Sequence, residues 1–254
     1  MTVGSARIAG RPSRIAAAFL GAPAYPATDA DRREIDVLGL RLPVRATVAI
    51  VVVVFALLFD YSRTFIGDEL LALGRAPEAM RAIALERAVL FGLVPLGVVI
   101  VGFRDRLGRY GLTVGDWRAG LTLMLLGCAV MTPVVVWFAA MGDVRDFYAP
   151  SAAALPDLLV TNTLDLAATE FLFRGFLMLT LVRAIGPLGV LVATMPFVFA
   201  HLGKPELELF STLAGGLVYG WLTWRTGSVL WGAAGHVYVL TLVTAAAAGG
   251  VAGA

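Results

Sequence analysis

Long apolar runs are the feature of this sequence that most restricts its fold. Residues 43–60 read PVRATVAIVVVVFALLFD, and the only charged side chains in this run are Arg45 and Asp60, near its two ends. A helix of about 20 such residues spans the hydrocarbon core of a bilayer. The chain is 59% hydrophobic and only 15% charged, whereas soluble domains are about a quarter charged, so one core cannot bury this much apolar surface. The sequence therefore predicts an all-α fold, a polytopic transmembrane helical bundle.

Further segments of this kind predict about seven spans. They cover residues 43–60, 87–103, 119–141, 157–183, 187–203, 206–224 and 228–248. Residues 66–86 are apolar on one helical face and charged on the other, which predicts an additional interfacial helix. We expect three parts: an N-terminal tail over 1–42, N-terminal transmembrane helices over 43–150, and a catalytic helical core over 151–254.

The basic residues alternate between the two sides of the membrane. One side is predicted to hold the arginines that flank the first span and those of later loops: Arg7, Arg11, Arg14, Arg32, Arg33, Arg41, Arg104, Arg106, Arg109, Arg118, Arg183 and Arg225. The loops on the other side are mixed or acidic, as in Asp143 and Asp146. The positive-inside rule therefore predicts a cytoplasmic N-terminal tail. The 19 arginines and single lysine are typical of a GC-rich bacterial genome, which favours the bacterial inner membrane.

Four ionisable side chains lie where lipid is expected. Glu170 and Arg174, one turn apart in ATEFLFRGF, and the only two histidines, His201 and His236, all fall within predicted spans. Each charge near a helix centre costs about 2.5–3.5 kcal/mol, so such groups face one another or a wet cavity. Counted along the helices at 1.5 Å per residue, Glu170 and His201 lie about 20 Å from one surface and His236 about 12 Å. We therefore expect the four side chains to meet in one intramembrane pocket.

A purely structural explanation is the alternative for each polar residue. A buried Glu–Arg pair and membrane histidines also serve to hold helices together, but four groups that include both histidines favour a site. Asp165, in the polar stretch NTLD, is more readily explained as a residue near the wet surface. Cys128 is expected to pack in the apolar bundle, and as the single cysteine it forms no intrachain disulfide.

The same residues resemble a known family. Glu170-Phe-Leu-Phe-Arg174-Gly175, Phe197-Val-Phe-Ala-His201 and Gly235-His236 are similar, on successive spans, to the EExxxR, FxxxH and HxxxN or HxxxD motifs of the CPBP family. This family of intramembrane proteases includes the CAAX prenyl endopeptidases and the bacteriocin-processing, Abi-like proteins. The resemblance covers about residues 150–245. It implies an endopeptidase that hydrolyses a peptide bond in a membrane-associated or lipid-anchored protein or peptide, with Glu170, Arg174, His201 and His236 as catalytic residues.

Two positions depart from the family pattern. Thr169 stands where the first Glu of the motif is expected, and Leu240 stands where Asn or Asp is expected. In the resembled enzymes the first Glu is usually assigned as the base that activates water. Either Glu170 is the single base, or Asp165, one turn before Thr169, reaches the site. We prefer Glu170, because the HLGKPELE stretch after His201 resembles a subgroup whose motif carries one Glu.

We favour a mechanism without a cofactor over one that uses zinc. Peptide hydrolysis needs a water, a base and donors for the oxyanion. Glu170 would activate the water, and His201 and His236 would position it, protonate the leaving amine or stabilise the oxyanion. Two histidines and one glutamate also match a zinc ligand set, but no HExxH motif is present and the site would then lack a separate base. Ser211 has no evident base partner, which disfavours a serine nucleophile.

Two other function classes remain open. Thr169 and Leu240 favour a catalytically inactive membrane scaffold or chaperone of the same family. Intramembrane Glu, Arg and His also line ion paths, as in a small proton-coupled transporter, although no inverted repeat is visible. The net charge of +2 and the scattered basic residues argue against a nucleic acid partner, so the expected partners are the lipid bilayer and a protein or peptide substrate. The substrate alternatives include a prenylated C-terminus and a bacteriocin leader.

Overall fold

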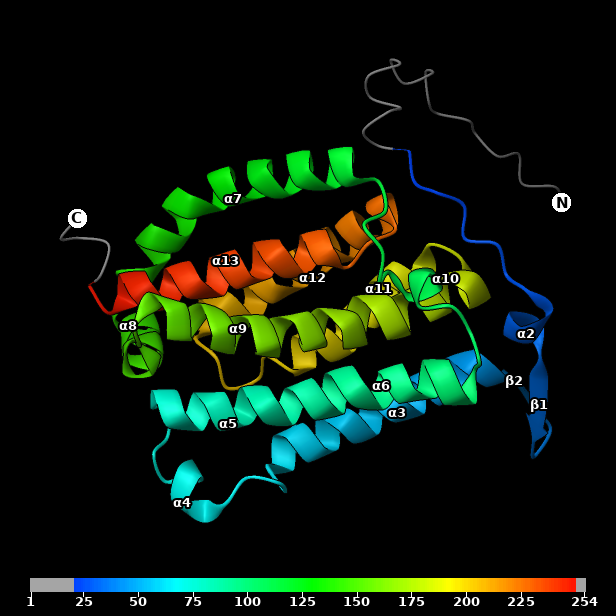
Figure 1. The fold of residues 1–254 in the computed structure, drawn as a ribbon, viewed down its shortest axis with the longest axis horizontal. Coiled ribbons are helices and arrows are strands. Elements are labelled where there is room, and N and C mark those ends of the chain that lie inside the picture. Colours follow the sequence, from blue (N-terminus) through cyan, green and yellow to red (C-terminus); the bar gives the residue numbers. More distant parts are fainter. Residues whose placement is uncertain (1–20, 250–254) are drawn as a thin grey trace, which may run out of the picture.

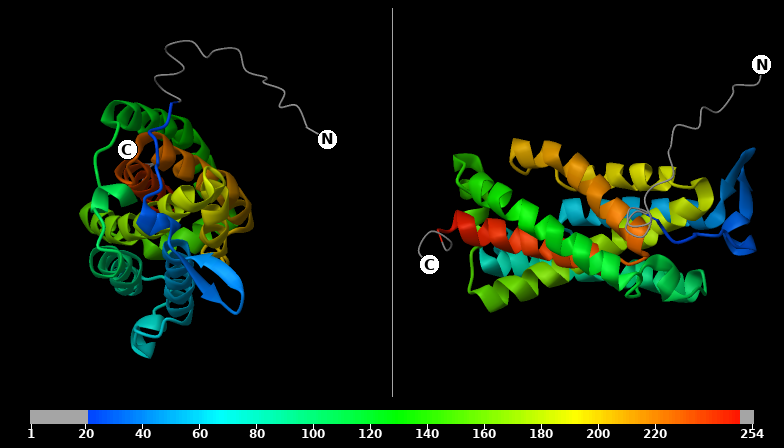
Figure 2. Two further views of the ribbon diagram at one scale, coloured as in Figure 1. Left: turned by 90° about the vertical axis from the view of Figure 1, so that its right-hand side faces the viewer. Right: turned by 90° about the horizontal axis from the view of Figure 1, so that it is seen from above.

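The structure, a computed structural model, describes residues 21–249 as a helical bundle with one small β-hairpin (Figure 1). Most helices run along one common direction, and the hairpin lies at the end from which the first long helix starts (Figure 2). The elements are α2 (Asp29–Arg32), β1 (Glu34–Val37), β2 (Leu40–Pro43), α3 (Val44–Ser62), α4 (Asp68–Leu71), α5 (Pro77–Arg87), η1 (Ala88–Leu93), α6 (Val94–Gly97), η2 (Val98–Gly102), η3 (Leu107–Tyr110), α7 (Trp117–Ala139), α8 (Gly142–Tyr148), η4 (Ala149–Ser151), α9 (Leu155–Glu170), η5 (Phe171–Met178), α10 (Leu179–Ile185), α11 (Leu188–Phe199), α12 (Glu206–Thr226) and α13 (Leu230–Ala247). The all-α architecture predicted from the apolar runs is confirmed.

Two long rods consist of several elements in direct succession. Elements α5, η1, α6 and η2 form one rod, Pro77–Gly102, of 26 residues. Elements α9, η5 and α10 follow one another without a break over residues 155–185. The middle of this second rod, η5, is a π-helix, a conformation that occurs mostly in short pieces and often at functional sites.

Each predicted span coincides with a helix, but only part of the predicted number meets the requirements for crossing a bilayer. Four helices of the described residues are long and apolar enough: Val44–Ser62, Pro77–Gly102, Trp117–Ala139 and Leu230–Ala247. Helix α11 is apolar but has only 12 residues. Helices α9 and α12 carry buried polar residues, including Asp165, Glu170 and Arg225. The predicted total of about seven spans is therefore not confirmed.

The prediction of one continuous interfacial helix over residues 66–86 is wrong. The chain forms the short helix α4, turns at Gly74, where φ is +61°, and starts a new helix with Pro77 in its first turn. Proline is well placed at the first turn of a helix, because its missing N–H has no partner there in any case. Residues 77–86 consequently form the first part of the second long rod.

The described part of the N-terminal tail, residues 21–42, has more structure than its composition suggested. It contains α2 and a hairpin in which Glu34 pairs with Pro43 and Val37 with Leu40. Gly39 lies in the turn of this hairpin with φ of +84°, a backbone conformation that residues with an L side chain rarely adopt. The predicted cytoplasmic arginines Arg7, Arg11 and Arg14 lie outside the described residues.

The rod α9–η5–α10 lies at the centre of the bundle. All residues from 168 to 183 are buried, and the rod contacts α3, the α5–η1 segment, α11 and α13. A helix that is enclosed on all sides is expected to be apolar all round, yet this one carries Glu170 and Arg174. At Gly175 an added Cβ would lie 2.5 Å from the carbonyl oxygen of Tyr110, so glycine allows the neighbouring loop to pack closely. The bundle therefore holds charges at its most enclosed position.

Candidate active site

A cavity of about 390 Å³ lies beside the central rod, and we call it the histidine cavity. It contains both histidines and is walled by α7, α9, α13, the start of α12 and the turn before it. Its lining residues include Arg87, Phe91, Met131, Val134, Trp137, Phe138, Tyr148, Asp165, Thr169, His201, Lys204, Leu207, Glu208, Ser211, His236 and Leu240. Glu170 and Arg174 are not among its lining residues. The four predicted site residues thus divide into two that face the cavity and two that lie behind its wall.

Glu170 is joined directly to His236. Nδ1 of His236, on α13, lies 2.8 Å from Oε1 of Glu170, at the end of α9. A carboxylate oxygen accepts hydrogen bonds, so this contact assigns the proton to Nδ1 and leaves Nε2 of His236 for the cavity. The Glu170 side chain is 0% exposed and that of His236 is 12% exposed. The carboxylate therefore reaches the cavity only through the imidazole.

Arg174 completes this cluster from η5, one turn further along the rod. Its Nη1 lies 3.3 Å from Oε1 of Glu170 as an ion pair, and its guanidinium carbon lies 3.6 Å from the centroid of the Phe197 ring. Neither terminal nitrogen of Arg174 makes a hydrogen bond within the described residues, and the same holds for Oε2 of Glu170 and Oγ1 of Thr223. Buried polar atoms without partners are rare in folded proteins and each needs an explanation. Four such atoms thus lie together around Glu170 and Arg174, which makes this a polar cluster that the described side chains leave incompletely bonded.

His201 lies in the turn that follows α11. Its Nδ1 is 2.8 Å from the carbonyl oxygen of Phe197, which only accepts, so Nδ1 carries a proton and Nε2 holds the lone pair of the neutral ring. The Phe197 ring lies near both histidines, with its centroid 4.5 Å from that of His201 and 6.0 Å from that of His236. On its other side, His236 stacks on Tyr219 at 5.0 Å. The aromatic rings thus fix the orientation of both imidazoles.

Asp165 lies in the cavity wall and not at a wet surface. It is 6% exposed, and Nη1 of Arg87 donates to both of its carboxylate oxygens at 3.1 and 3.0 Å. The hydroxyl of Thr169 donates to Oδ1 of Asp165 at 3.3 Å. Arg87 also donates to Asp60, at 2.7 Å from its Nε. Asp165 is therefore a charge-paired member of the site, one turn before Thr169, and its oxygens already have donors.

Sequence reasoning missed three charged residues of the cavity. They are Arg87, Lys204 and Glu208; Lys204 donates to Oε1 of Glu208 at 2.7 Å, and the hydroxyl of Tyr148 also donates to Glu208. A signal for Arg87 was present, because an arginine at the start of an apolar run needs a buried partner. Leu240 lines the same cavity one turn after His236 and contributes no polar atom.

The side chains at the site were candidates for metal ligands on sequence grounds. Within residues 21–249, no group of three or more His, Cys, Asp or Glu side chains is placed to hold a metal ion. Nδ1 of each histidine is bonded, to Phe197 and to Glu170 respectively, so the lone pair of each neutral ring is on Nε2.

Comparison with known proteins supports the family resemblance. The model of a protein family described as type II CAAX prenyl endopeptidase Rce1-like matches residues 151–242, a segment that contains Glu170, Arg174, His201 and His236. The match confirms the resemblance to CPBP proteases that the motifs indicated. Neither the curated proteins nor the solved structures contain a match. Together with the four apolar helices, the match supports an integral membrane protein.

Proposed function

We propose that this chain, whose residues 151–242 match the CAAX prenyl endopeptidase model, is an intramembrane endopeptidase that cleaves a membrane-associated protein or peptide. The observation that carries the proposal is the Glu170–His236 hydrogen bond at the wall of a cavity that also contains His201. A buried carboxylate that orients an imidazole is a recurrent way to make a general base.

In the proposed reaction Glu170 acts through His236. Nε2 of His236 takes a proton from a water while the water oxygen attacks the carbonyl carbon of the substrate peptide bond. Glu170, 2.8 Å from Nδ1, stabilises the resulting imidazolium. This modifies the expectation that Glu170 itself takes the proton, because its side chain is fully enclosed.

The other cavity groups complete the reaction. Nε2 of His201 accepts a hydrogen bond from the attacking water and orients it. The Arg87 guanidinium lines the cavity and its positive charge stabilises the oxyanion, whereas the single hydroxyl proton of Thr169 is already donated to Asp165. When the tetrahedral intermediate collapses, the carbon–nitrogen bond breaks and the His236 imidazolium returns its proton to the leaving amine. No step uses a metal or a cofactor.

A catalytically inactive scaffold is the second candidate. It is favoured by Leu240, which places no polar group beside His236, and by Thr169 at the first motif position. In this alternative the cavity binds a membrane protein segment without cleaving it. A proton-coupled transporter is a third candidate, and proton-dependent uptake into liposomes would favour it.

The test is cleavage of a peptide library by the full chain purified in detergent. We expect turnover by the wild-type protein and a loss of about 10³-fold or more in Glu170→Gln and in His201→Ala, since general-base catalysis contributes about 10²–10⁴-fold. Glu206→Gln is the matched control, because Glu206 is exposed and lies outside the cavity lining. Full activity in Glu170→Gln would exclude this carboxylate from the reaction, and loss of activity on adding a chelator would favour a metal. Binding of a peptide without cleavage would support the scaffold.

A further inference from the structure

The histidine cavity lies toward one end of the bundle. Helix α11 has 12 residues, about 18 Å at 1.5 Å per residue, so the turn that carries His201 and Lys204 ends part-way along the longer helices. The cavity is also lined by Phe138 near the end of α7 and by Tyr148 of α8. Figure 1 shows α8 and α4 at the same end of the bundle, and the hairpin β1–β2 at the other. We call the end with α4 and α8 the cavity end.

A second cavity connects this site to the cavity end. It has a volume of about 590 Å³ and lies between the end of α3, α5 and the α11–α12 turn. Both cavities are lined by Arg87, Tyr148, Asp165, Lys204 and other residues, so the two spaces adjoin. The second cavity also includes Tyr61 and Leu202, which are 87% and 62% exposed. The histidine cavity is therefore reached from the cavity end along a wall of charged side chains.

The histidine cavity also opens sideways, through an apolar wall. Met131, Val134 and Trp137 of α7 line it and are nevertheless 37%, 46% and 63% exposed. Leu207 of α12 lines it too and is 44% exposed. Helix α7 is one of the four helices able to cross a membrane, so this side of the cavity faces lipid. One cavity thus has an apolar opening toward the bilayer and a polar opening toward the cavity end.

The opposite end of the bundle carries the arginines. There lie the hairpin region, the start of α7, the loop before it and the ends of α10 and α12 (Figure 1). Their basic residues are Arg32, Arg33, Arg41, Arg104, Arg106, Arg109, Arg118, Arg183 and Arg225. The loops 63–76, 140–154 and 200–205 at the cavity end hold fewer basic residues: Arg63, Arg75, Arg145 and Lys204. By the positive-inside rule, the arginine-rich end lies in the cytoplasm and the cavity end outside it.

We infer that the site is entered from the extracytoplasmic side, and that its substrate is a membrane-anchored protein which presents an extended segment just outside the membrane on that side. The apolar opening accepts the anchor, and the polar opening accepts the chain where it leaves the lipid. The substrate part of this inference rests on the proposed function. It excludes a lipidated C-terminus in the cytoplasm, because such a chain would meet the arginine-rich end, whose cavity is lined by Arg109, Arg183 and Arg225 and by neither histidine.

The side of access is tested by cysteine labelling in cells that express the full chain. In a Cys128→Ser background, which removes the single cysteine, Leu202→Cys marks the cavity end and Leu38→Cys marks the hairpin. Both leucines lie in exposed turns, 62% and 99% exposed, and form a matched pair. A membrane-impermeant maleimide is expected to label Leu202→Cys in intact spheroplasts and Leu38→Cys only after permeabilisation. The reverse pattern, labelling of both before permeabilisation, or no labelling of Leu202→Cys would overturn the inference.

The substrate class is tested with two reporter proteins. Each carries the same peptide, chosen from the library cleavage products, beside a transmembrane helix, on the extracytoplasmic side in one and on the cytoplasmic side in the other. We expect cleavage of the extracytoplasmic reporter alone, and its loss in Glu170→Gln. Cleavage of the cytoplasmic reporter would overturn the inference. If labelling follows the expected pattern and purified protein cleaves nothing, the hydrolase proposal fails while the extracytoplasmic opening stands.

Discussion

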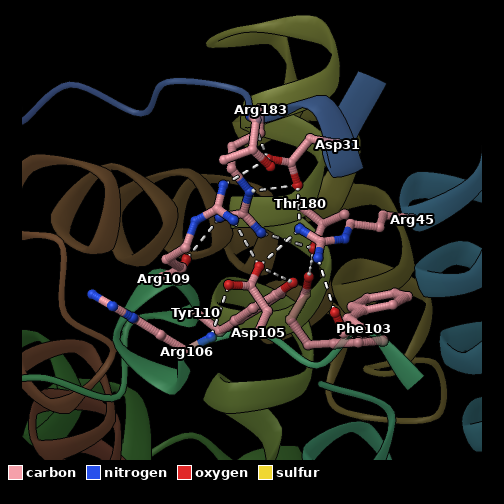
Figure 3. Close-up of polar contacts among 11 residues, drawn as sticks. Asp31, Arg45, Phe103, Asp105, Arg106, Arg109, Tyr110, Thr180 and Arg183 are labelled. Carbon is pink, nitrogen blue, oxygen red and sulfur yellow. Dashed lines mark hydrogen bonds and ion pairs between the residues drawn. The ribbon is translucent and has the colours of Figure 1, made fainter. Parts of the chain in front are cut away.

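The molecule buries charges in two clusters, one at the α10 end of its central rod and one at the middle of the rod, and the clusters differ in how completely they are bonded. The first, which we call the Asp31 cluster, lies near the arginine-rich end and consists of Asp31, Arg45, Asp105, Arg109 and Arg183 (Figure 3). The second, the Glu170 cluster, consists of Glu170, Arg174 and His236.

The Asp31 cluster is almost fully paired. Arg45 bridges Asp31 and Asp105 at 2.8 Å each, and Arg109 bridges the same two carboxylates at 2.6 and 2.7 Å. Arg183 donates to the carbonyl oxygen of Arg109 at 2.7 Å, and only its Nε lacks a hydrogen bond. This network joins α2, α3, the loop at 105–109 and α10, so it acts as a clamp.

The Glu170 cluster contrasts with this clamp, because one carboxylate oxygen and two guanidinium nitrogens have no hydrogen-bond partner among the described residues. A saturated buried network stabilises a fold, whereas an unsaturated one is costly unless something else completes it. Under the proposed function, the Asp31 cluster serves stability and the Glu170 cluster serves chemistry. We therefore expect substitutions in the Asp31 cluster to lower stability and leave activity largely unchanged. Substitutions in the Glu170 cluster should lower activity and leave stability largely unchanged.

The largest effect on activity is expected from His236→Gln. Glutamine keeps a donor for Glu170 but takes up no proton at neutral pH, so we expect peptide cleavage to fall by about 10³-fold or more. The thermal unfolding midpoint in detergent should change little. If His236→Gln instead unfolds readily while its folded fraction cleaves peptide normally, the Glu170 cluster serves stability and not catalysis.

The largest effect on stability is expected from Asp31→Asn. Removing one carboxylate from a buried network leaves Arg45, Arg109 and Arg183 with excess positive charge and costs about 3–5 kcal/mol. Thermal unfolding in detergent measures the loss, while cleavage per folded molecule should be retained. Asp29→Asn on the same helix is the matched control, because the Asp29 side chain is exposed and its ion pair with Arg32 is long, at 3.5 Å. Equal effects of the two substitutions would contradict the clamp.

The Asp31 cluster also predicts a pH dependence. Burial raises the pKa of Asp31, but hydrogen bonds from the Thr28 backbone N–H, Arg45 and Arg109 outweigh it and hold the pKa well below its usual range. The folded state thus favours the carboxylate, whose stabilising contribution is complete above the unfolded pKa and is lost as pH falls toward the folded value. Below about pH 4 we expect the thermal unfolding midpoint of the wild-type protein to fall. The midpoint of Asp31→Asn should fall less over the same pH range. Parallel pH curves for the two proteins would argue against this assignment.

A smaller effect is expected from Tyr219→Leu. Tyr219 stacks on His236 with ring centroids 5.0 Å apart and an interplanar angle of 17°. Aromatic pairs contribute about 0.5–1.5 kcal/mol, so losing the stack should lower the cleavage rate by up to about tenfold. Tyr219→Phe keeps the ring and should retain most of the activity; a loss as large as in the leucine variant would instead point to the hydroxyl.

The sequence alone predicted the helices and the pairing of Glu170 with Arg174, because residues four apart share a helical face. It also predicted one pocket for these two residues and both histidines, but only His201 and His236 line the cavity, with Glu170 bonded to His236 behind its wall. His201 packs against the Phe197 ring and lines the same cavity as His236. Sequence reasoning did not find the Arg87–Asp165 pair, since it joins residues 78 positions apart on two rods. It also misplaced the start of the second rod, where Pro77 begins a helix that continues through residues 87–102. Such features depend on which helices become neighbours, and local patterns do not encode that.

The central claim is that the protein hydrolyses a peptide bond in the histidine cavity, beside Glu170. Its most direct test is cleavage of a library peptide by purified protein in ¹⁸O-enriched water, followed by mass spectrometry of the fragments. We predict one ¹⁸O atom in the new C-terminal carboxylate with the wild-type protein, and no product with Glu170→Gln. Cleavage that persists unchanged in Glu170→Gln, or fragments that carry no ¹⁸O, would contradict the account.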